Sequence, residues 1–281
     1  MREISVDLIE KTAYELILEA NTCIGSDIGR AVQNACQNEP SPAGRAVLRQ
    51  LLDNYQIARE ERVAICQDTG MCVIFLDIGQ DAHITGGDLT DALNSATRRA
   101  YTDGYLRKSI VRDPLYDRVN TRDNTPAIVH TRIVPGEKVD ILVTPKGIGS
   151  ENMSRIKMLV PADGEQGVID FVTETVRLAG PNPCPPVIVG VGVGGSFESA
   201  ALMAKRMTAR SLDEPNPDPR YQALEAKILQ KINALGIGPA GIGGRNTALA
   251  VHIMAAPTHI GGLPVAVNLC CHAARHAQRT I

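Results

Sequence analysis

The sequence predicts a mixed α/β (α+β) fold, in which a helical N-terminal lobe packs on a larger α/β lobe. The first 62 residues carry apolar side chains at helical spacing. Residues 63–281 alternate strand-like apolar runs with helical segments and glycine-rich turns. Because the chain has 281 residues and no long linker, we expect the lobes 1–62 and 63–281 to form a single domain, 1–281.

The expected helices are segments in which apolar side chains recur every three or four residues. The first covers Val6–Ala20. The second begins at Ser41-Pro42, where a serine cap precedes a proline in the first turn, and continues to about Glu61. The sequence predicts further helices over Asp88–Leu106, Gly167–Leu178, Phe197–Arg210 and Tyr221–Leu235.

The expected strands are shorter apolar runs bounded by glycine, proline or polar residues. Pro126–Val134 and Lys138–Thr144 are separated by Pro135-Gly136, so we expect them to form a β-hairpin. The sequence predicts further strands over Arg62–Ile65, Cys72–Ile78, Pro186–Val191, Ala248–Met254 and Leu263–Leu269.

Composition and charge argue against several classes of protein. The 29 basic and 31 acidic residues give a net charge of −2, which provides no electrostatic footprint for nucleic acid or an anionic membrane. The longest apolar stretches are far shorter than the ~18 residues of a membrane-spanning helix. The first seven residues include Arg2, Glu3 and Asp7 and are not typical of a secretory signal. We therefore expect a cytoplasmic protein with no nucleic-acid or membrane partner.

Three of the seven cysteines stand in unusual surroundings. Cys66 begins a short turn, Cys66–Gly70, that also contains an amide, a carboxylate and a hydroxyl. Cys184 lies between prolines, and Cys271 follows a predicted strand. An odd number of cysteines without a signal peptide argues against a disulfide framework. The spacing of Cys66, Cys184 and Cys271 matches no rule for zinc or ferredoxin-type clusters. These three cysteines could therefore be metal ligands or buried structural residues.

A glycine-rich segment offers a different hypothesis. Gly190–Gly195 matches the G-x-G-x-x-G pattern between a predicted strand and a predicted helix, which is typical of dinucleotide-binding proteins. No acidic residue stands out about 20 residues further on. A tight strand-to-helix turn is the simpler interpretation, and a small anion at the start of the helix is another. A nucleotide-binding oxidoreductase is therefore one alternative.

Basic and histidine side chains near turns are further candidates. A basic residue beside glycines can clamp a carboxylate or a phosphate, although a solvated surface charge is the simpler interpretation. His259 lies in a loop between two predicted strands, whereas His252 lies within a strand and is expected to be a core or interface histidine. The basic candidates are Arg107, Lys108, Lys146 and Arg245.

Together these segments resemble the iron–sulfur hydro-lyases called class I fumarases, specifically the alpha subunit of the two-subunit form. The L-tartrate dehydratase alpha subunit is a near relative. The resemblance extends over essentially the whole chain and rests on eight motifs in order. These motifs are Ile65–Gly70, Tyr105–Ser109, Val119–Thr121 with Asn124–Ala127, Lys146–Ser154, Asn182–Pro186, Gly241–Arg245, Pro257–His259 and Cys271–Arg275.

The resemblance implies a [4Fe–4S] cluster held by three thiolates, which match Cys66, Cys184 and Cys271. The fourth iron would then have no protein ligand and could act as a Lewis acid on the hydroxyl that leaves. Cys271, rather than its neighbour Cys270, matches the ligand because Arg275 follows it by four residues. The other cysteines match no family ligand and are expected to be core residues: Cys23, Cys36 and Cys72.

The resemblance also implies roles around a dicarboxylate substrate. Asp68 and His259 would form a catalytic pair that handles protons near the substrate hydroxyl. Arg107 would clamp a carboxylate, Gln67 would contact the substrate, and Gly149 would offer backbone where a side chain would clash. The roles of the remaining polar candidates stay open: Asn120, Lys146 and Arg245.

The activity implied by this resemblance is the reversible hydration of fumarate to (S)-malate, a reaction of the tricarboxylic acid cycle. The base that takes the carbon-bound proton lies in a separate beta subunit in this family. We therefore expect a homodimer of alpha chains within a hetero-oligomer. The alternatives are an L(+)-tartrate dehydratase alpha subunit, a non-catalytic subunit that carries or assembles a cluster, and the oxidoreductase above.

Overall fold

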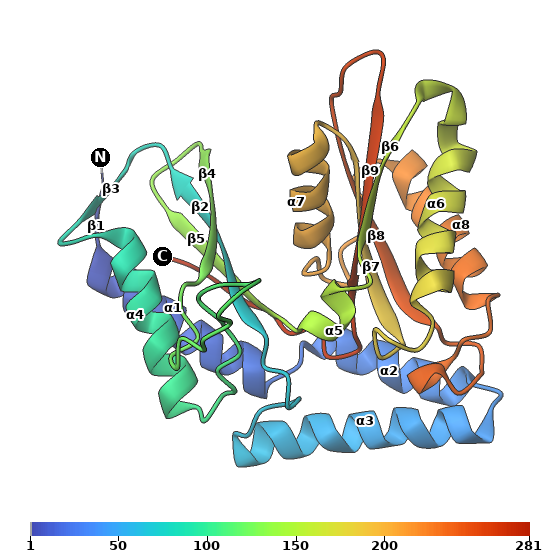
Figure 1. Cartoon of the computed structure of the whole chain (residues 1–281), viewed down its shortest axis with the longest axis horizontal. Helices are drawn as coiled ribbons and strands as arrows, with labels where there is room; N and C mark the ends of the chain where they lie inside the picture. Colours follow the sequence, from blue (N-terminus) through green and yellow to red (C-terminus); the bar gives the residue numbers. More distant parts are fainter. Residues whose placement is uncertain (1) are drawn as a thin grey trace. The chain divides into compact units, whose positions relative to one another are not determined.

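The computed structural model describes residues 2–281 and divides the chain into two compact units (Figure 1). The first unit contains the chain up to Gly25, together with Tyr55–Ile148 and Arg275–Ile281. The second unit contains Ser26–Asn54 and Gly149–Ala274. Both contain helices and a four-stranded sheet, so the predicted mixed α/β class is confirmed.

The helices of residues 1–62 do not form a lobe of their own. Helix α1 (Val6–Thr22) belongs to the first unit, and α2 (Ser26–Asn38) belongs to the second. Helix α3 (Pro42–Glu61) begins in the second unit and ends in the first. The reason is that the apolar face of each helix packs on a different sheet: α1 contacts β5 (Val139–Lys146), and α2 contacts β8 (Ala248–Ala256). The expectation of a single domain stays a prediction.

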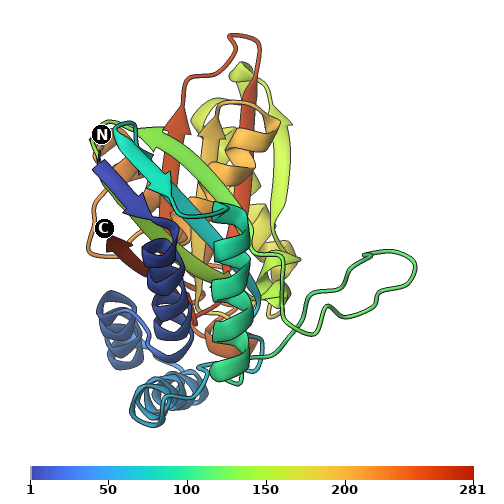
Figure 2. The same cartoon turned by 90° about the vertical axis from the view of Figure 1, so that its left-hand side faces the viewer.

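The first unit is built on a sheet with the strand order β10-β5-β2-β4. Its other strands, in addition to β5, are β2 (Met71–Gly79), β4 (Ile128–Val134) and β10 (Ala277–Thr280). Helices α1 and α4 (Leu89–Asp103) lie side by side (Figure 2). Their apolar faces share one buried core with the strands, which includes Leu16, Leu93 and Ile74. Two short parallel strands, β1 (Arg2–Ser5) and β3 (Ala82–Thr85), complete this unit.

The hairpin predicted across Pro135-Gly136 is wrong, although both of its strands exist. β4 and β5 flank β2: β4 pairs with it in parallel, and β5 pairs with it antiparallel. The end of β2 inserts between them, since Gly79 N donates to Lys138 O at 2.8 Å and Asp81 N donates to Gly136 O at 2.9 Å. β2 is buried along most of its length and lies between β4 and β5, an arrangement that a local turn signal could not reveal.

The second unit is a sheet covered by helices on both faces (Figure 1). Its strand order is β6-β9-β7-β8. Its other strands, in addition to β8, are β6 (Arg155–Leu159), β7 (Val187–Gly194) and β9 (Leu263–Cys270). Helices α6 (Gly164–Ala179) and α8 (Pro219–Asn233) share the larger core with one face, and α7 (Phe197–Met207) packs on the other. The short helical turns are α5 (Ile148–Glu151), η1 (Pro161–Asp163) and η2 (Pro239–Gly241).

Most predicted elements are confirmed to within a few residues, but the ends of the chain and the shortest strands are not. The predicted strand Arg62–Ile65 is a turn and bend instead. Strands β1, β3, β6 and β10 were not predicted. Each has four or five residues, too few for a strand pattern to stand out in the sequence.

The glycines of the G-x-G-x-x-G segment have a packing role. A Cβ atom at Gly190 would lie 2.1 Å from the carbonyl oxygen of Ala204, and one at Gly192 would lie 2.1 Å from that of Ala200. Both contacts come from α7, so these glycines allow the helix to approach β7 closely. This packing explains the glycine pattern without a bound nucleotide. The G-x-G-x-x-G pattern therefore no longer supports an oxidoreductase.

A buried carboxylate organises the glycine-rich loop near Arg245. Glu39 is 1% exposed. Its oxygens accept N–H bonds from Ser41, Arg245 and Asn246 at 3.0–3.1 Å, and from the side-chain amide of Asn246 at 2.8 Å. Burial alone would raise the pKa of Glu39, but these hydrogen bonds outweigh it and hold the pKa below the usual value.

Glu39→Ala is therefore expected to lower the free energy of unfolding by about 3 kcal/mol, because several buried N–H groups lose their acceptor. Urea unfolding measures the effect. Glu214→Ala is the control, since Glu214 is exposed in the same unit, and its expected change is below about 0.5 kcal/mol. Equal changes in the two variants would contradict the role given to Glu39.

Candidate active site

The turn Cys66–Gly70 joins α3 to β2 and is tightly folded. Asp68 N donates to the Sγ atom of Cys66 at 3.4 Å, and Gly70 N donates to Oδ1 of Asp68 at 3.1 Å. Gly70 has φ +72°, and a Cβ atom there would lie 2.4 Å from the Lys146 carbonyl. Only glycine allows this combination of backbone conformation and close approach. The turn therefore packs closely on the end of β5 and holds the Cys66 thiol beside the backbone of Asp68.

Two side chains from other segments and the backbone of Arg107 fix this turn. The buried Tyr101 hydroxyl of α4 lies 3.0 Å from the carbonyl oxygens of both Thr69 and Gly70. Thr69 Oγ1 accepts from Arg107 N at 3.0 Å and donates to Arg107 O at 3.2 Å. Asn124 Nδ2 donates to Gly70 O at 3.1 Å. The thiol, the carboxylate and Arg107 therefore belong to one hydrogen-bonded assembly.

Asp68 is oriented by backbone donors. Its Oδ2 accepts from Ile148 N at 2.9 Å, while its carbonyl accepts from Nη2 of Arg275 at 2.8 Å. A Cβ atom at Gly147 would lie 3.0 Å from Oδ2, so the glycine makes room for the carboxylate. Both carboxylate oxygens accept N–H bonds, which keeps the group in one position beside the cavity described next.

A cavity of about 380 Å³ opens beside this turn. Among the described residues, those that line the cavity include one carboxylate, Asp68, and four basic side chains from two segments of the first unit. The basic side chains are Arg107, Lys108, Arg118 and Lys146. Lys146 is 1% exposed, although it ends β5. A small cavity with this excess of positive charge suits a ligand with more than one carboxylate.

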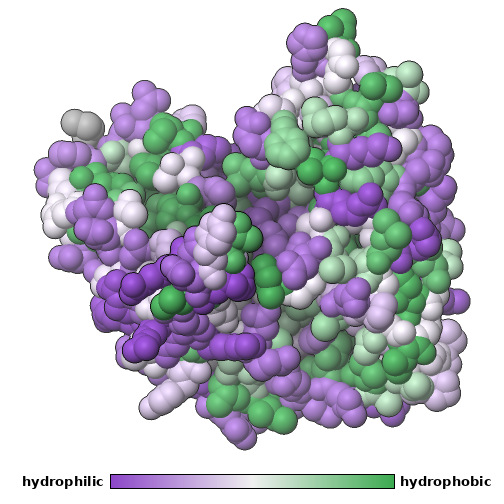
Figure 3. All heavy atoms as spheres, in the orientation of Figure 1, coloured by the Kyte–Doolittle hydropathy of each residue, from purple (hydrophilic) through white to green (hydrophobic). Residues whose placement is uncertain are grey.

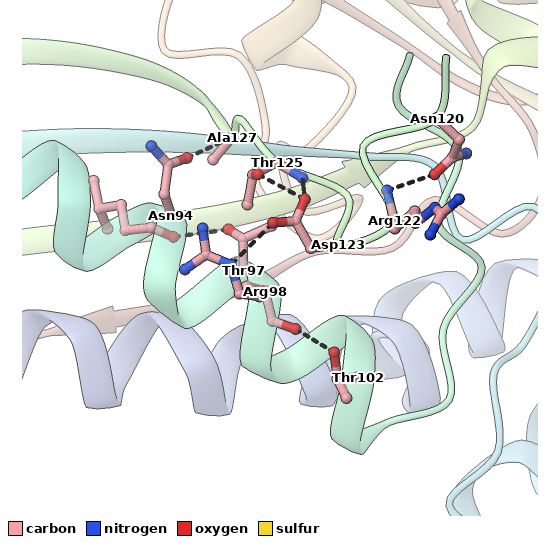
Figure 4. A network of polar contacts seen from close by, with 10 residues as sticks. Asn94, Thr97, Arg98, Thr102, Asn120, Arg122, Asp123, Thr125 and Ala127 are labelled. Carbon is pink, nitrogen blue, oxygen red and sulfur yellow. Dashed lines mark hydrogen bonds and ion pairs between the residues drawn. The ribbon is translucent and has the colours of Figure 1, made fainter. Parts of the chain in front are cut away.

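Several cationic residues come from a long arm, residues 105–125, which projects from the first unit (Figure 2). Its return to α4 is anchored by Asp123, which accepts from Arg98 Nε at 2.9 Å and from Thr125 Oγ1 at 2.7 Å (Figure 4). Partial burial acts to raise the pKa of Asp123, but these donors lower it to about 2. Asn120 Nδ2 donates to Lys108 O at 2.9 Å and links the two sides of the arm.

The second unit carries the other candidate cysteines. Cys184 is exposed and has φ +55°, between two prolines. His272 N donates to Cys184 O at 3.4 Å, so the half-buried Cys271 lies next to the segment that bears Cys184. Cys270 ends β9 and is buried. A Cβ atom at Gly149 would meet nothing closer than Asn182 O at 4.0 Å, so the space around this glycine is open within its unit.

His259 lies in the loop between β8 and β9 and is exposed. Its Nδ1 accepts from Gly261 N at 3.0 Å. An accepting Nδ1 carries no proton, so a neutral imidazole presents its proton at Nε2. The ring is thereby held with one N–H group directed away from its own turn.

The predicted site residues fall into two groups. Cys66, Gln67, Asp68 and Arg107 lie together in the first unit, where Gln67 is exposed beside the Cys66 thiol. Gly149, Cys184, His259 and Cys271 lie in the second unit. Among residues 2–281, no three His, Cys, Asp or Glu side chains converge as a preformed metal site. A cysteine cluster stays a prediction.

Two site residues were not predicted from the sequence. Arg118 lines the cavity although its neighbours are typical of a surface loop, and Arg275 lies 2% exposed beneath the Cys66–Gly70 turn. Both positions depend on contacts between distant segments. The only sequence signal for Arg275 is its place four residues after Cys271.

The remaining cysteines bear out the prediction in part. Cys72 is buried in the core of the first unit, and burial raises the pKa of its thiol to about 12. Cys23 and Cys36 are only half-buried. Within residues 2–281 all seven cysteines are outside any disulfide.

His252 is a core histidine, as predicted, and sits 3% exposed in β8 with Nδ1 3.0 Å from Met207 O. Burial, with a smaller contribution from Arg210, lowers its pKa from 6.5 to about 4. The unfolded chain therefore binds more protons than the folded chain between these values. The free energy of unfolding is expected to fall by about 3 kcal/mol as the pH decreases from 6.5 to 4.

The measurement is urea unfolding at several pH values. Carboxylates also titrate in this range, so the pH dependence is compared with that of His252→Gln, in which this decrease is expected to disappear. His83→Gln is the control, because His83 is exposed. A wild-type pH dependence in His252→Gln would contradict a neutral, buried His252.

Comparisons with known proteins show which sequences this chain is similar to. Residues 10–280 match the model of a family described as fumarate hydratase (Fumerase). A Methanocaldococcus jannaschii protein described as "Putative L(+)-tartrate dehydratase subunit alpha" is 36% identical over 277 residues, which cover 97% of each chain. The L(+)-tartrate dehydratase subunits alpha of Escherichia coli strains UTI89 and K12 are each 32% identical over 259 residues, 91% of this chain and 84% of theirs.

These matches define an alpha-type chain of the iron–sulfur hydro-lyases, which are carbon–oxygen lyases. The chain belongs to the fumarate hydratase (Fumerase) family. Among the described residues, no helix is long and apolar enough to cross a membrane. On the face drawn in Figure 3, hydrophobic residues are interspersed with hydrophilic ones.

Proposed function

We propose that this chain is the alpha subunit of an L(+)-tartrate dehydratase, which removes water from L(+)-tartrate to give oxaloacetate. The relatives that match nearly the whole chain support tartrate over the fumarate expected from the sequence. The observation that carries the proposal is the cation-lined cavity beside Cys66 and Asp68. A four-carbon dianion that loses a hydroxyl needs positive groups for its carboxylates and a group that assists the leaving hydroxyl.

We propose further that the thiolates of Cys66, Cys184 and Cys271 hold a [4Fe–4S] cluster. Soft thiolates are the ligands such clusters require, and none of these three thiols is fully buried. Buried N–H groups of Arg275 beside the Cys66–Asp68 segment also suit an anionic group. When bound, the cluster would supply an iron that acts as a Lewis acid on the hydroxyl of the substrate.

The residues of this chain would bind and orient the substrate. Arg107 would pair with one carboxylate in the bidentate geometry that guanidinium groups allow. Gln67 would contact the substrate, and Gly149 would offer backbone with open space around it. Asp68, fixed by backbone N–H donors, and His259, with its proton at Nε2, would handle the proton that leaves with the hydroxyl.

We also propose that a beta subunit supplies the base that removes the carbon-bound proton, and that alpha chains form a homodimer within the hetero-oligomer. The description of the relatives as "subunit alpha" supports a partner of this kind. A fumarate hydratase is the second candidate, because the matching family carries that description. The two reactions share the gain or loss of water across two adjacent carbons of a dicarboxylate.

The test is turnover by the chain purified with its beta subunit under anaerobic conditions. Oxaloacetate formed from L(+)-tartrate and (S)-malate formed from fumarate are measured side by side. The proposal predicts a kcat/KM for L(+)-tartrate at least ~10-fold above that for fumarate, a difference of about 1.4 kcal/mol. The reverse ratio would favour the fumarase alternative. A chain that holds its cluster but turns over neither substrate would indicate the non-catalytic alternative.

A further inference from the structure

Arg275 has a fixed place beneath the Cys66–Gly70 turn. Thr144 Oγ1 donates to its carbonyl oxygen at 3.2 Å, and two residues later the chain enters β10, where Ala277 pairs with Val143. The residue is 2% exposed. The backbone is therefore held on β5, and the guanidinium group projects into the interior of the first unit.

Only one of the three nitrogen atoms of this guanidinium group has a hydrogen-bond acceptor among the described residues. Nη2 donates to the carbonyl oxygen of Asp68 at 2.8 Å. Nε and Nη1 are buried and have no hydrogen-bond partner among the described residues. A buried cation with two unpaired donor atoms costs several kcal/mol unless an anionic acceptor is present. The carboxylate of Asp68 already accepts from Gly70 N and Ile148 N.

The guanidinium group and the Cys66 thiol contact the same residue. Asp68 donates its N–H to Sγ of Cys66 at 3.4 Å and offers its carbonyl oxygen to Arg275. The neighbouring Gly147 keeps the space open, since a Cβ atom there would lie 3.6 Å from Nη2. Arg275 is absent from the described lining of the substrate cavity. Its position therefore fits an acceptor on the thiol side of the turn, not the substrate.

We propose that Arg275 is a positioning residue for the iron–sulfur cluster. This inference rests on the proposed function. The Nη2 donor fixes the turn that presents Cys66, and the Nε and Nη1 donors would be available to the anionic sulfur of a bound cluster. A cationic N–H donor stabilises the more negative, reduced state of a cluster and so raises its reduction potential. It also opposes loss of iron, because it offsets the charge of the thiolates.

The test compares wild type with Arg275→Gln, Arg275→Lys and Arg279→Gln, all purified anaerobically without substrate. Arg279 is a matched control, since it lies in β10 only four residues away but is exposed and paired with Glu15. The readouts are iron and acid-labile sulfide per chain, the rate of iron loss to a chelator, and the cluster potential from a titration followed by electron paramagnetic resonance. Thermal unfolding of the iron-free proteins reports on folding.

The expected result is that Arg275→Gln loses iron at least ~5-fold faster than wild type and has a more negative potential. Arg275→Lys, which keeps the charge but not the planar fork, should fall between the two, and Arg279→Gln should match wild type. If Arg275→Gln does not fold, the iron loss and cluster potential of Arg275→Lys still test whether Arg275 positions the cluster. Wild-type potential and iron loss in either folded Arg275 variant would overturn the inference. A wild-type chain that binds no cluster would instead overturn the proposed function.

Discussion

Serine at Cys66, Cys184 or Cys271 is expected to reduce the iron bound by the anaerobically purified chain by roughly tenfold, because two thiolates do not retain a four-iron cluster. Each substitution is small and removes only the soft sulfur ligand. Cys184 is exposed and Cys66 and Cys271 are half-buried, so serine is expected to leave the folds of both units intact. Iron and acid-labile sulfide are measured on the same samples.

Cys270→Ser is the sharpest control, because Cys270 directly precedes Cys271 but is buried at the end of β9. It is expected to keep the full iron content. Cys36→Ser, at a half-buried position in α2, is a second control. Loss of iron in Cys270→Ser with retention in Cys271→Ser would reassign the third ligand. Retention in all three ligand variants would contradict the proposed cluster.

Arg107→Met is expected to lower kcat/KM about 100- to 1000-fold in the complex with the beta subunit, because a carboxylate of the substrate loses its guanidinium partner. The main-chain groups of Arg107, which bond to Thr69 Oγ1, are unchanged in this variant. The Cys66–Gly70 turn should therefore keep its structure, and the iron content should match that of wild type.

Arg112→Met is the matched control, since Arg112 is an exposed arginine of the same arm outside the described cavity lining. Its kcat/KM is expected to change by less than about threefold. Equal losses in the two variants would indicate that the positive charge of the arm, rather than a specific clamp at Arg107, supports activity.

The elements of the fold follow from the sequence better than their pairing does. The helical spacing of α1 and the Ser41-Pro42 start of α3 are local features, and both predictions are confirmed. The order β10-β5-β2-β4 depends on which strand buries both faces, a property of the assembled sheet. A turn such as Pro135-Gly136 marks a reversal of the chain but does not identify the strand that β4 will pair with.

The candidate site shows the same limit. The Cys66–Gly70 turn and Arg107 could be singled out because unusual residues are adjacent in the sequence. Arg118 could not, because its place in the cavity lining depends on segments distant in the chain. The sequence marks Arg275 only by its place four residues after Cys271, and its contact with Asp68 could not be predicted. Gly190 shows the opposite error: its motif is local and clear, but the structure uses it for the close contact with Ala204 of α7.

The central claim is that this chain is an iron–sulfur hydro-lyase subunit, and its most direct test is the iron and acid-labile sulfide content of the anaerobically purified wild-type chain. The account predicts about four of each per chain, either as purified or after reconstitution with iron and sulfide. A folded chain that binds neither after reconstitution would contradict the cluster, and with it the hydro-lyase mechanism proposed for Cys66, Cys184 and Cys271.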